Sequence, residues 1–171
     1  MGQKTMLFRS VDPGISLTFG KLALKKGLFC FAKGDHFWSS FRIKILGATL
    51  PGTIMDLESD HLYGLAGPRL SLHNGSLRVE NKFGAKEIYS QQNPIPFPTS
   101  QWVDIKIHLV LDDTGAGIIE AWQNNTKVIS AQGKNLPLSD TILNRYEIGV
   151  TVAEDAVDLE IDDVRVSNEP L

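Results

Sequence analysis

The sequence predicts an all-β fold in which two antiparallel sheets pack face to face, and three features support this prediction. Apolar and polar residues alternate with a period of two along most of the chain. Convincing helical periodicity is hard to find, and residues typical of tight turns separate the alternating stretches. About ten short strands joined in this way favour a β-sandwich or jelly roll.

The clearest alternating stretches are residues 37–45 and 103–111, each with one apolar face. The polar face of the first stretch carries Trp38, Ser40, Arg42 and Lys44. The polar face of the second stretch carries Asp104, Lys106 and His108. One buried face and one polar face is the pattern of a strand in an antiparallel sheet.

Two hairpins can be placed from turn residues. Asn74-Gly75 is a strong signal for a type I′ turn, because both central residues of that turn need a positive φ. Folding about this turn pairs Leu72 with Leu77, Leu70 with Val79, Ser71 with Arg78, and Arg69 with Glu80. A second hairpin is expected to turn near Asn124-Asn125.

Three other segments interrupt the strand pattern. Residues 93–98 contain three prolines, which lack an amide hydrogen, and are predicted to form a loop between the sheets. Residues 112–115 predict a tight turn. Near the end of the chain, the apolar positions change phase after Ile161, which predicts a β-bulge at Asp162-Asp163.

The composition is that of an ordinary globular protein, with 42% hydrophobic and 22% charged residues in 171 and a net charge of −3. We expect one domain over residues 1–171, either mature or excised from a longer protein. The chain lacks the cluster of basic residues that binding to a nucleic acid requires, so no nucleic-acid partner is expected. No apolar run is long enough for a membrane span. No signal peptide is visible, which leaves an extracellular mature or excised domain and a cytoplasmic protein both open.

Cys30 is the single cysteine, which excludes an internal disulfide and a cysteine-based zinc site. It lies in the apolar stretch 28–32, so we expect a buried, unreactive thiol. The four histidines show no zinc-ligand spacing, and the sequence contains no phosphate-binding loop or nucleophile elbow.

The order of several motifs resembles the concanavalin A-like lectin/glucanase superfamily. The motifs are Phe37–Ile43, Trp102–Ile107, Gly117–Asn125, Tyr146–Val150 and the closing strand Leu159–Val166. The resemblance implies a two-sheet jelly roll. It specifies the fold better than the function, because this sandwich hosts lectins, laminin G-like domains, glycosidases and polysaccharide lyases.

The resemblance also allows two catalytic interpretations, both with departures from the family pattern. The glycosidase motif Glu-x-Asp-x-x-Glu is incomplete, because Arg165 stands where the third carboxylate of the string beginning at Glu160 would be. The strand Tyr-x-Lys-x-Gly-x-Tyr of alginate-lyase-like relatives is similar to Tyr146–Thr151, without the lysine and the second tyrosine. A lyase or hydrolase with a diverged site remains the alternative, carried by some combination of Arg42, His108, Glu120 and Tyr146.

A structural calcium ion is the one metal that the resemblance suggests, and no cofactor is expected to be required. Many relatives hold calcium near the last strand or at a surface turn, with oxygen ligands. The local carboxylates there are Asp158, Glu160, Asp162 and Asp163. A solvated strand face with a bulge explains the same cluster without a metal.

Tryptophans on the polar faces of strands suggest a carbohydrate ligand. Exposed aromatic rings on the concave sheet of this fold can stack on sugars, while charged groups bind the hydroxyls. The expected ligand-binding residues are Trp38, Arg42, His108, Glu120 and Trp122. We therefore expect a non-catalytic carbohydrate-binding, lectin-like or adhesive module with a glycan partner. A structural or protein-interaction module in a larger assembly is a third interpretation.

Overall fold

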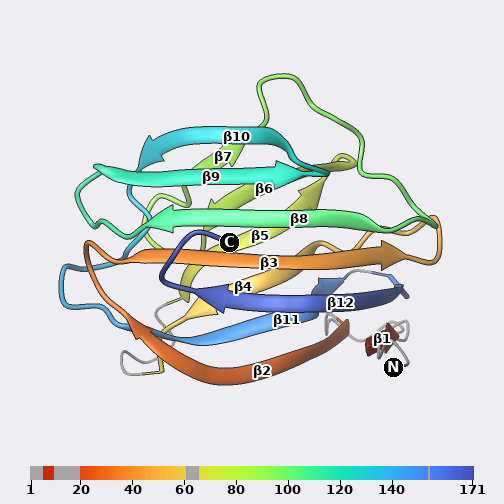
Figure 1. The fold of residues 1–171 in the computed structure, drawn as a ribbon, viewed down its shortest axis with the longest axis horizontal. Helices are drawn as coiled ribbons and strands as arrows, with labels where there is room; N and C mark the ends of the chain where they lie inside the picture. Colours follow the sequence, from red (N-terminus) through yellow and green to blue (C-terminus); the bar gives the residue numbers. More distant parts are fainter. Residues whose placement is uncertain (1–5, 10–19, 61–65, 154) are drawn as a thin grey trace.

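The protein is a sandwich of two antiparallel sheets, as predicted (Figure 1). The computed structural model describes residues 6–9, 20–60, 66–153 and 155–171, and within these ranges it contains twelve strands and no helix. Accordingly, no helix in this part of the chain could cross a membrane.

Each sheet has six strands and combines strands that are consecutive in sequence with strands that are distant in it. Sheet A, which faces the viewer in Figure 1, has the order β1 (Met6–Arg9), β12 (Asp158–Ser167), β3 (His36–Ile45), β8 (Val103–Val110), β9 (Gly117–Gln123) and β10 (Thr126–Gly133). Sheet B lies behind it, in the order β2 (Gly20–Phe31), β11 (Leu143–Ala153), β4 (Thr53–Glu58), β5 (Ala66–His73), β6 (Ser76–Asn81) and β7 (Ile88–Ser90).

The core fills the space between the sheets with the apolar faces that the alternation predicts. On β3 and β8 every second side chain is buried, and the intervening polar residues point outward. The buried residues of these two strands include Phe37, Phe41, Ile43, Val103, Ile105, Ile107 and Leu109. Sheet B contributes residues such as Met55, Leu70, Val79, Ile148 and Val150. Burying one face of each strand leaves two outer faces on which polar side chains gather.

The hairpin of β5 and β6 is confirmed in its register. Asn74 and Gly75 have φ values of 48° and 76°, as a type I′ turn requires. The predicted pairs Leu72–Leu77, Leu70–Val79, Ser71–Arg78 and Arg69–Glu80 all occur.

The other predicted turns and irregularities are confirmed as well. Asn124 and Asn125 connect β9 to β10 with φ values of 48° and 64°. Residues 93–98 form a loop, and the register of β12 against β3 shifts between Asp162 and Arg165. At this bulge Asp163 has a φ of 53°.

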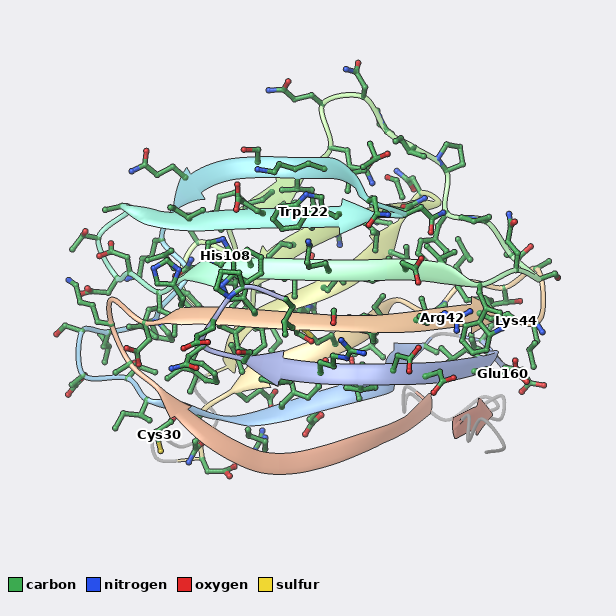
Figure 2. All side chains as sticks on the ribbon, viewed as in Figure 1. Cys30, Arg42, Lys44, His108, Trp122 and Glu160 are labelled. Atoms are coloured by element: carbon green, nitrogen blue, oxygen red, sulfur yellow. The ribbon has the colours of Figure 1, made fainter. Side chains whose placement is uncertain are left out.

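The prediction of a buried Cys30 thiol is wrong. Cys30 lies on β2, at one edge of sheet B, and its side chain is exposed (Figure 2). The next residue, Phe31, is buried in the core. Because successive side chains of a strand point to opposite faces, the burial of Phe31 turns Cys30 outward.

Candidate functional site

The expected ligand-binding residues all lie on the outer face of sheet A, and four of them form one stack. The rings of Trp38 and His108 are nearly parallel, with centroids 3.9 Å apart. The centroids of Trp38 and Trp122 are 6.0 Å apart. His108 contacts the fourth residue, Glu120, through a hydrogen bond of 2.8 Å. Figure 2 shows His108 and Trp122 on adjacent strands of this face.

A hydrogen-bond chain runs through His36, His108 and Glu120, whereas the buried indole Nε1 of Trp38 has no hydrogen-bond partner among the described residues. The Glu120 carboxylate only accepts, so Nδ1 of His108 donates to it. In the neutral imidazole, Nε2 of His108 then accepts from Nδ1 of His36, 3.0 Å away. Burial raises the pKa of Glu120, but the hydrogen bonds from His108 and Lys127 outweigh it and hold the pKa below its usual range. The His108 imidazole and the Glu120 carboxylate are therefore already occupied by partners within the protein.

Arg42, the fifth expected residue, lies apart from the stack. Its guanidinium carbon is 4.9 Å from the ring centroid of Trp102. Its nitrogens lie 3.6 Å from Asp104 and 3.7 Å from Asp163. Arg42 therefore does not join His108 and Glu120 in one site.

The carboxylates expected to bind calcium do not converge in the described part of the chain, where no group of three potential metal ligands is found. Glu160 lies 3.4 Å from the ammonium of Lys44. Asp162 accepts the amide hydrogen of Asp163 in the bulge. Calcium binding through Asp158 and its neighbours stays a prediction.

Tyr146 does not fit the catalytic combination in which the sequence placed it. Its side chain is buried between the sheets, and its hydroxyl lies 2.8 Å from that of Ser39. Burial raises the pKa of Tyr146, so the phenol stays protonated. The spacing explains the error. In the pattern Tyr-x-Lys-x-Gly-x-Tyr the first tyrosine lies four residues before the glycine, and the residue at that position here is Arg145. Tyr146 is one position out of phase and faces inward.

Sequence reasoning missed a second polar surface, on the outer face of sheet B. A cross-strand row of side chains runs over four neighbouring strands, from Glu147 on β11 through Asp56 and Arg69 to Glu80 on β6. Three of these residues are carboxylates, and all three are buried. Burying so many charges on one face requires cations beside them.

Two arginines bind Glu80 in this row. Nη2 of Arg78 is 2.8 Å from one Glu80 oxygen, and Nε of Arg69 contacts the other oxygen. Nε of Arg78 also donates to the hydroxyl of Ser71, at 3.3 Å. The buried carboxylate thus fixes the direction of both guanidinium groups.

Further along the same face, Lys82 and Arg145 bind a second set of carboxylates. The Lys82 ammonium is 2.6 Å from Asp56 and also contacts Glu58, which Arg145 contacts in turn. Burial lowers the pKa of Lys82, although the charge of Asp56 raises it. Nε of Arg145 is 3.5 Å from Glu147 on the same strand.

The charges on this face are layered. The side chains of Arg69 and Arg78 are 29% and 21% exposed, whereas that of Glu80 is 7% exposed. The Lys82 side chain is 16% exposed and that of Asp56 is 5% exposed. Around Glu80 and Asp56 the cations are thus more exposed than the carboxylates that they cover, whereas Asp60, at 48%, is more exposed than its partner Arg145, at 18%.

A pocket of about 380 Å³ opens at the end of this face, beside the turn of the β5–β6 hairpin. Its lining includes Thr53, Arg69, His73, Arg78 and Glu80. The hairpin register, which the sequence did predict, places the odd-numbered positions 69 to 73 and the even-numbered positions 76 to 80 on one face. That register was the signal that could have revealed this pocket.

The comparisons with known proteins concern the fold. No protein-family model matches the chain, and no curated protein matches its sequence. Solved structures do match. An endo-β-1,4-glucuronan lyase from the fungus Trichoderma reesei has a TM-score of 0.77 at 10% identity, over 95% of this chain and 80% of that chain. The protein has the concanavalin A-like jelly-roll fold.

Other jelly rolls of this kind are also similar. An alginate lyase of polysaccharide lyase family 7 has a TM-score of 0.63 at 12% identity, over 98% of this chain and 81% of that chain. Cip1, a cellulose-induced protein, has a TM-score of 0.61 at 13% identity, over 99% and 88% of the two chains. At such identities the likeness establishes the jelly roll alone, and the chemistry must be argued from this chain's own residues.

Proposed function

We propose that this jelly-roll protein binds an acidic polysaccharide built of uronate units on the outer face of sheet B and cleaves it by β-elimination. The layering of charge on that face carries the proposal. The guanidinium groups of Arg69 and Arg78 cover the buried Glu80 and share a pocket with the exposed His73. The similarity of the fold to glucuronan and alginate lyases supports the same class of substrate.

The arginines supply the cation that such a reaction needs at the uronate carboxylate. Arginine suits this role because its planar group can donate two parallel hydrogen bonds to a carboxylate. Arg69 contacts Glu80 through Nε, and its side chain is 29% exposed, so the guanidinium group is accessible to a ligand in the pocket. Neutralising the carboxylate stabilises the negative charge that develops when the neighbouring carbon loses its proton.

His73 supplies the base. It removes the proton from C5 of the uronate, the electrons of that C–H bond form the C4–C5 double bond, and the C4–O bond breaks. The leaving oxygen takes the proton from the imidazolium, which restores the neutral histidine. The products are an unsaturated uronate end and a new hydroxyl end, with no co-reactant.

The test is incubation of the protein with alginate and with glucuronan, followed by the ultraviolet absorbance of the unsaturated product. We expect His73→Ala to lower the rate by about 100-fold or more, the usual contribution of a general base. Arg69→Gln should lower it comparably, because the carboxylate loses its cation. Lys86→Gln is the matched control, since Lys86 is exposed beyond the end of β6, outside the pocket. No absorbance with any uronate polymer would overturn the cleavage.

A second candidate function is binding of the same polymer without cleavage. It is favoured by β11, where Arg145, Glu147 and Thr151 occupy the face on which the lyase-like pattern has tyrosine, lysine and tyrosine. Affinity electrophoresis in gels containing alginate separates the two functions. Retardation that Arg69→Gln abolishes, with no unsaturated product, would assign binding alone.

A further inference from the structure

The outer face of sheet A carries its own cross-strand row, on the opposite side of the sandwich from the pocket with His73. Cα pairing places Arg165 of β12 opposite Ser40, Ser40 opposite Lys106, and Lys106 opposite Trp122. Lys127 of β10 is paired with Trp122 and ends the row. Between Arg165 and Trp122 the row spans roughly 14 Å, because neighbouring strands lie about 4.8 Å apart.

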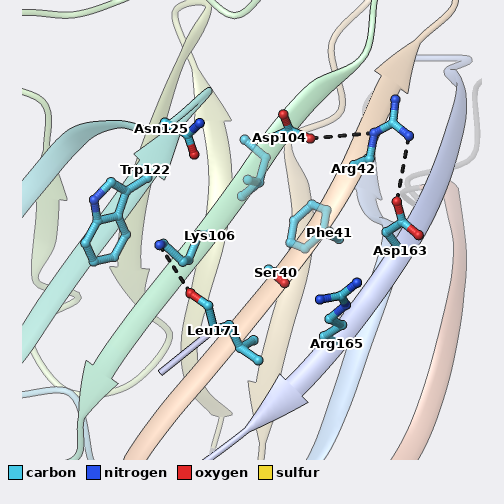
Figure 3. A pocket seen from close by; sticks show the side chains of 11 residues that line it. Ser40, Phe41, Arg42, Asp104, Lys106, Trp122, Asn125, Asp163, Arg165 and Leu171 are labelled. Carbon is cyan, nitrogen blue, oxygen red and sulfur yellow. Dashed lines mark hydrogen bonds and ion pairs between the residues drawn. The ribbon is translucent and has the colours of Figure 1, made fainter. Parts of the chain in front are cut away.

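A pocket of about 240 Å³ lies over this row (Figure 3). The figure shows Trp122 at one side with Lys106 beside it, and Arg42, Asp163 and Arg165 at the other side. All five of these residues line the pocket.

The bulge in β12 brings Arg165 into the row. Before the bulge, Leu159 and Ile161 are buried, so an uninterrupted strand would turn residue 165 toward the core as well. The register shift between Asp162 and Arg165 reverses this, and the side chain of Arg165 is exposed. Bulges commonly redirect a side chain in this way.

The cations of the pocket differ in their partners. Arg42 lies between Asp104 and Asp163, at 3.6 and 3.7 Å, so its single positive charge is shared by two carboxylates. Lys106 donates to the backbone oxygen of Leu171, at 3.4 Å, and Arg165 has no carboxylate partner among the described residues. Arg165 is therefore the cation of this pocket that is left to bind an anion.

Trp122 adds an apolar wall beside this charge. Its ring centroid lies 4.8 Å from the ammonium of Lys106 and 5.0 Å from that of Lys127. The indole is half-buried, so part of it remains open to the pocket. An aromatic surface beside cationic side chains suits a ligand with both C–H faces and a carboxylate.

We propose that this pocket is a second binding site for a carboxylated sugar unit. Arg165 and Lys106 hold the carboxylate, and Trp122 contacts the sugar ring. A neutral sugar would leave the charge of Arg165 without a partner, which is why the ligand is acidic. The site does not depend on cleavage at the other face, and it would keep a polymer attached to the protein while a second stretch of it occupies the pocket with His73.

The test uses alginate tetrasaccharide as the acidic probe and cellotetraose as the neutral one. We expect the acidic probe to shift the indole N–H signal of Trp122 in a ¹H–¹⁵N spectrum, identified by its absence in Trp122→Phe. Arg165→Gln and Lys106→Gln should each weaken the Kd by about tenfold, as expected for loss of a charge-assisted hydrogen bond. The matched control is Lys44→Gln on the same face of β3, outside the pocket lining.

Variants of the two faces separate this proposal from the proposed function. Arg69→Gln should leave the Trp122 shift intact, and Arg165→Gln should leave the cleavage of short oligosaccharides intact. An Arg165→Gln protein that binds the acidic probe as the wild type does would overturn the second site. So would equal affinity for cellotetraose, because the unmatched charge would then play no part.

Discussion

The hydroxyl groups of Ser39 and Tyr146 lie 2.8 Å apart in the core, one supplied by β3 of sheet A and the other by β11 of sheet B. Both side chains are buried, so each hydroxyl needs the other as its partner. The pair bridges the two sheets through an otherwise apolar core. This hydrogen bond gives Tyr146, on the strand that resembles the lyase pattern, a structural role.

Tyr146→Phe should therefore lower the stability and leave the function unchanged. We expect a loss of about 1–2 kcal/mol in the free energy of unfolding, because the Ser39 hydroxyl loses its buried partner. Urea unfolding measures the stability, and polymer binding and cleavage measure the function. In the double variant Ser39→Ala/Tyr146→Phe the two losses should not add, since both remove one hydrogen bond. A loss of cleavage with unchanged stability would contradict this role.

The fold was predictable because its signals are local. Alternation fixes which face of a strand is buried, and the φ values demanded by Asn74-Gly75 fix the register of the hairpin. The apolar change of phase after Ile161 revealed the bulge for the same reason. Each of these features depends on residues close together in the sequence.

The candidate site was less predictable because it depends on which strands become neighbours. Glu147 meets Asp56 only when β11 inserts between β2 and β4, a long-range pairing that alternation does not specify. Tyr146 shows a second difficulty, since a shift of one residue in a motif comparison reverses the face of the sheet. The hydrogen bond between His36 and His108 likewise joins strands distant in sequence.

Glu80→Gln tests the carboxylate that holds the two arginines. We expect a loss of roughly 2 kcal/mol in stability, below the cost of breaking a fully buried pair because both guanidinium groups reach solvent. Binding of uronate polymer should weaken as well, since Arg69 and Arg78 lose their fixed direction. Urea unfolding and affinity electrophoresis measure the two effects. Glu169→Gln, at an exposed position, is the control and should change neither.

Gly133→Ala tests the packing of β7 against β10. A Cβ atom at Gly133 would lie 2.8 Å from ring carbons of Tyr89, and hydrogen bonds to Glu87 and the Lys134 carbonyl hold that ring in place. We expect a loss of roughly 1–3 kcal/mol, as for other overpacked sites. Thermal unfolding measures it.

Two variants control for the glycine substitution itself. Gly47→Ala should be nearly neutral, because the nearest atom to its new Cβ is 4.0 Å away. In a Tyr89→Leu background the penalty at Gly133 should shrink, since the clashing ring is gone. A penalty of the same size in both backgrounds would show that backbone conformation, and not Tyr89, causes it.

Cys30 should react with a thiol reagent in the native protein. Its side chain is exposed on β2, so modification needs no unfolding. We expect one equivalent of thiol to react with Ellman's reagent in the absence of denaturant, at a rate that denaturant changes little. Cys30→Ser should abolish the signal without changing stability. Reaction only after unfolding would show that the thiol is covered.

The carboxyl group of Glu120 should make part of the stability pH-dependent. Burial raises the pKa of Glu120, but the hydrogen bonds from His108 and Lys127 lower it by more, so the pKa lies below the ordinary value of 4.5. A carboxyl group with a depressed pKa in the folded state adds stability above its unfolded pKa, and this stability is lost as the pH falls through the folded pKa. The contribution is thus complete at neutral pH and disappears in acid.

Comparing wild type with Glu120→Gln in urea from pH 7 to pH 3 measures this contribution. The wild type should be the more stable at neutral pH, and the gap should narrow as the pH falls below about 4.5, where the unfolded carboxyl group takes up its proton. In a Lys127→Gln background, the loss of stability caused by Glu120→Gln at neutral pH should be smaller, because one of the two hydrogen bonds to Glu120 is already lost. A gap that stays constant down to pH 3 would show that Glu120 acts through packing, since a shifted pKa must appear as a dependence on pH.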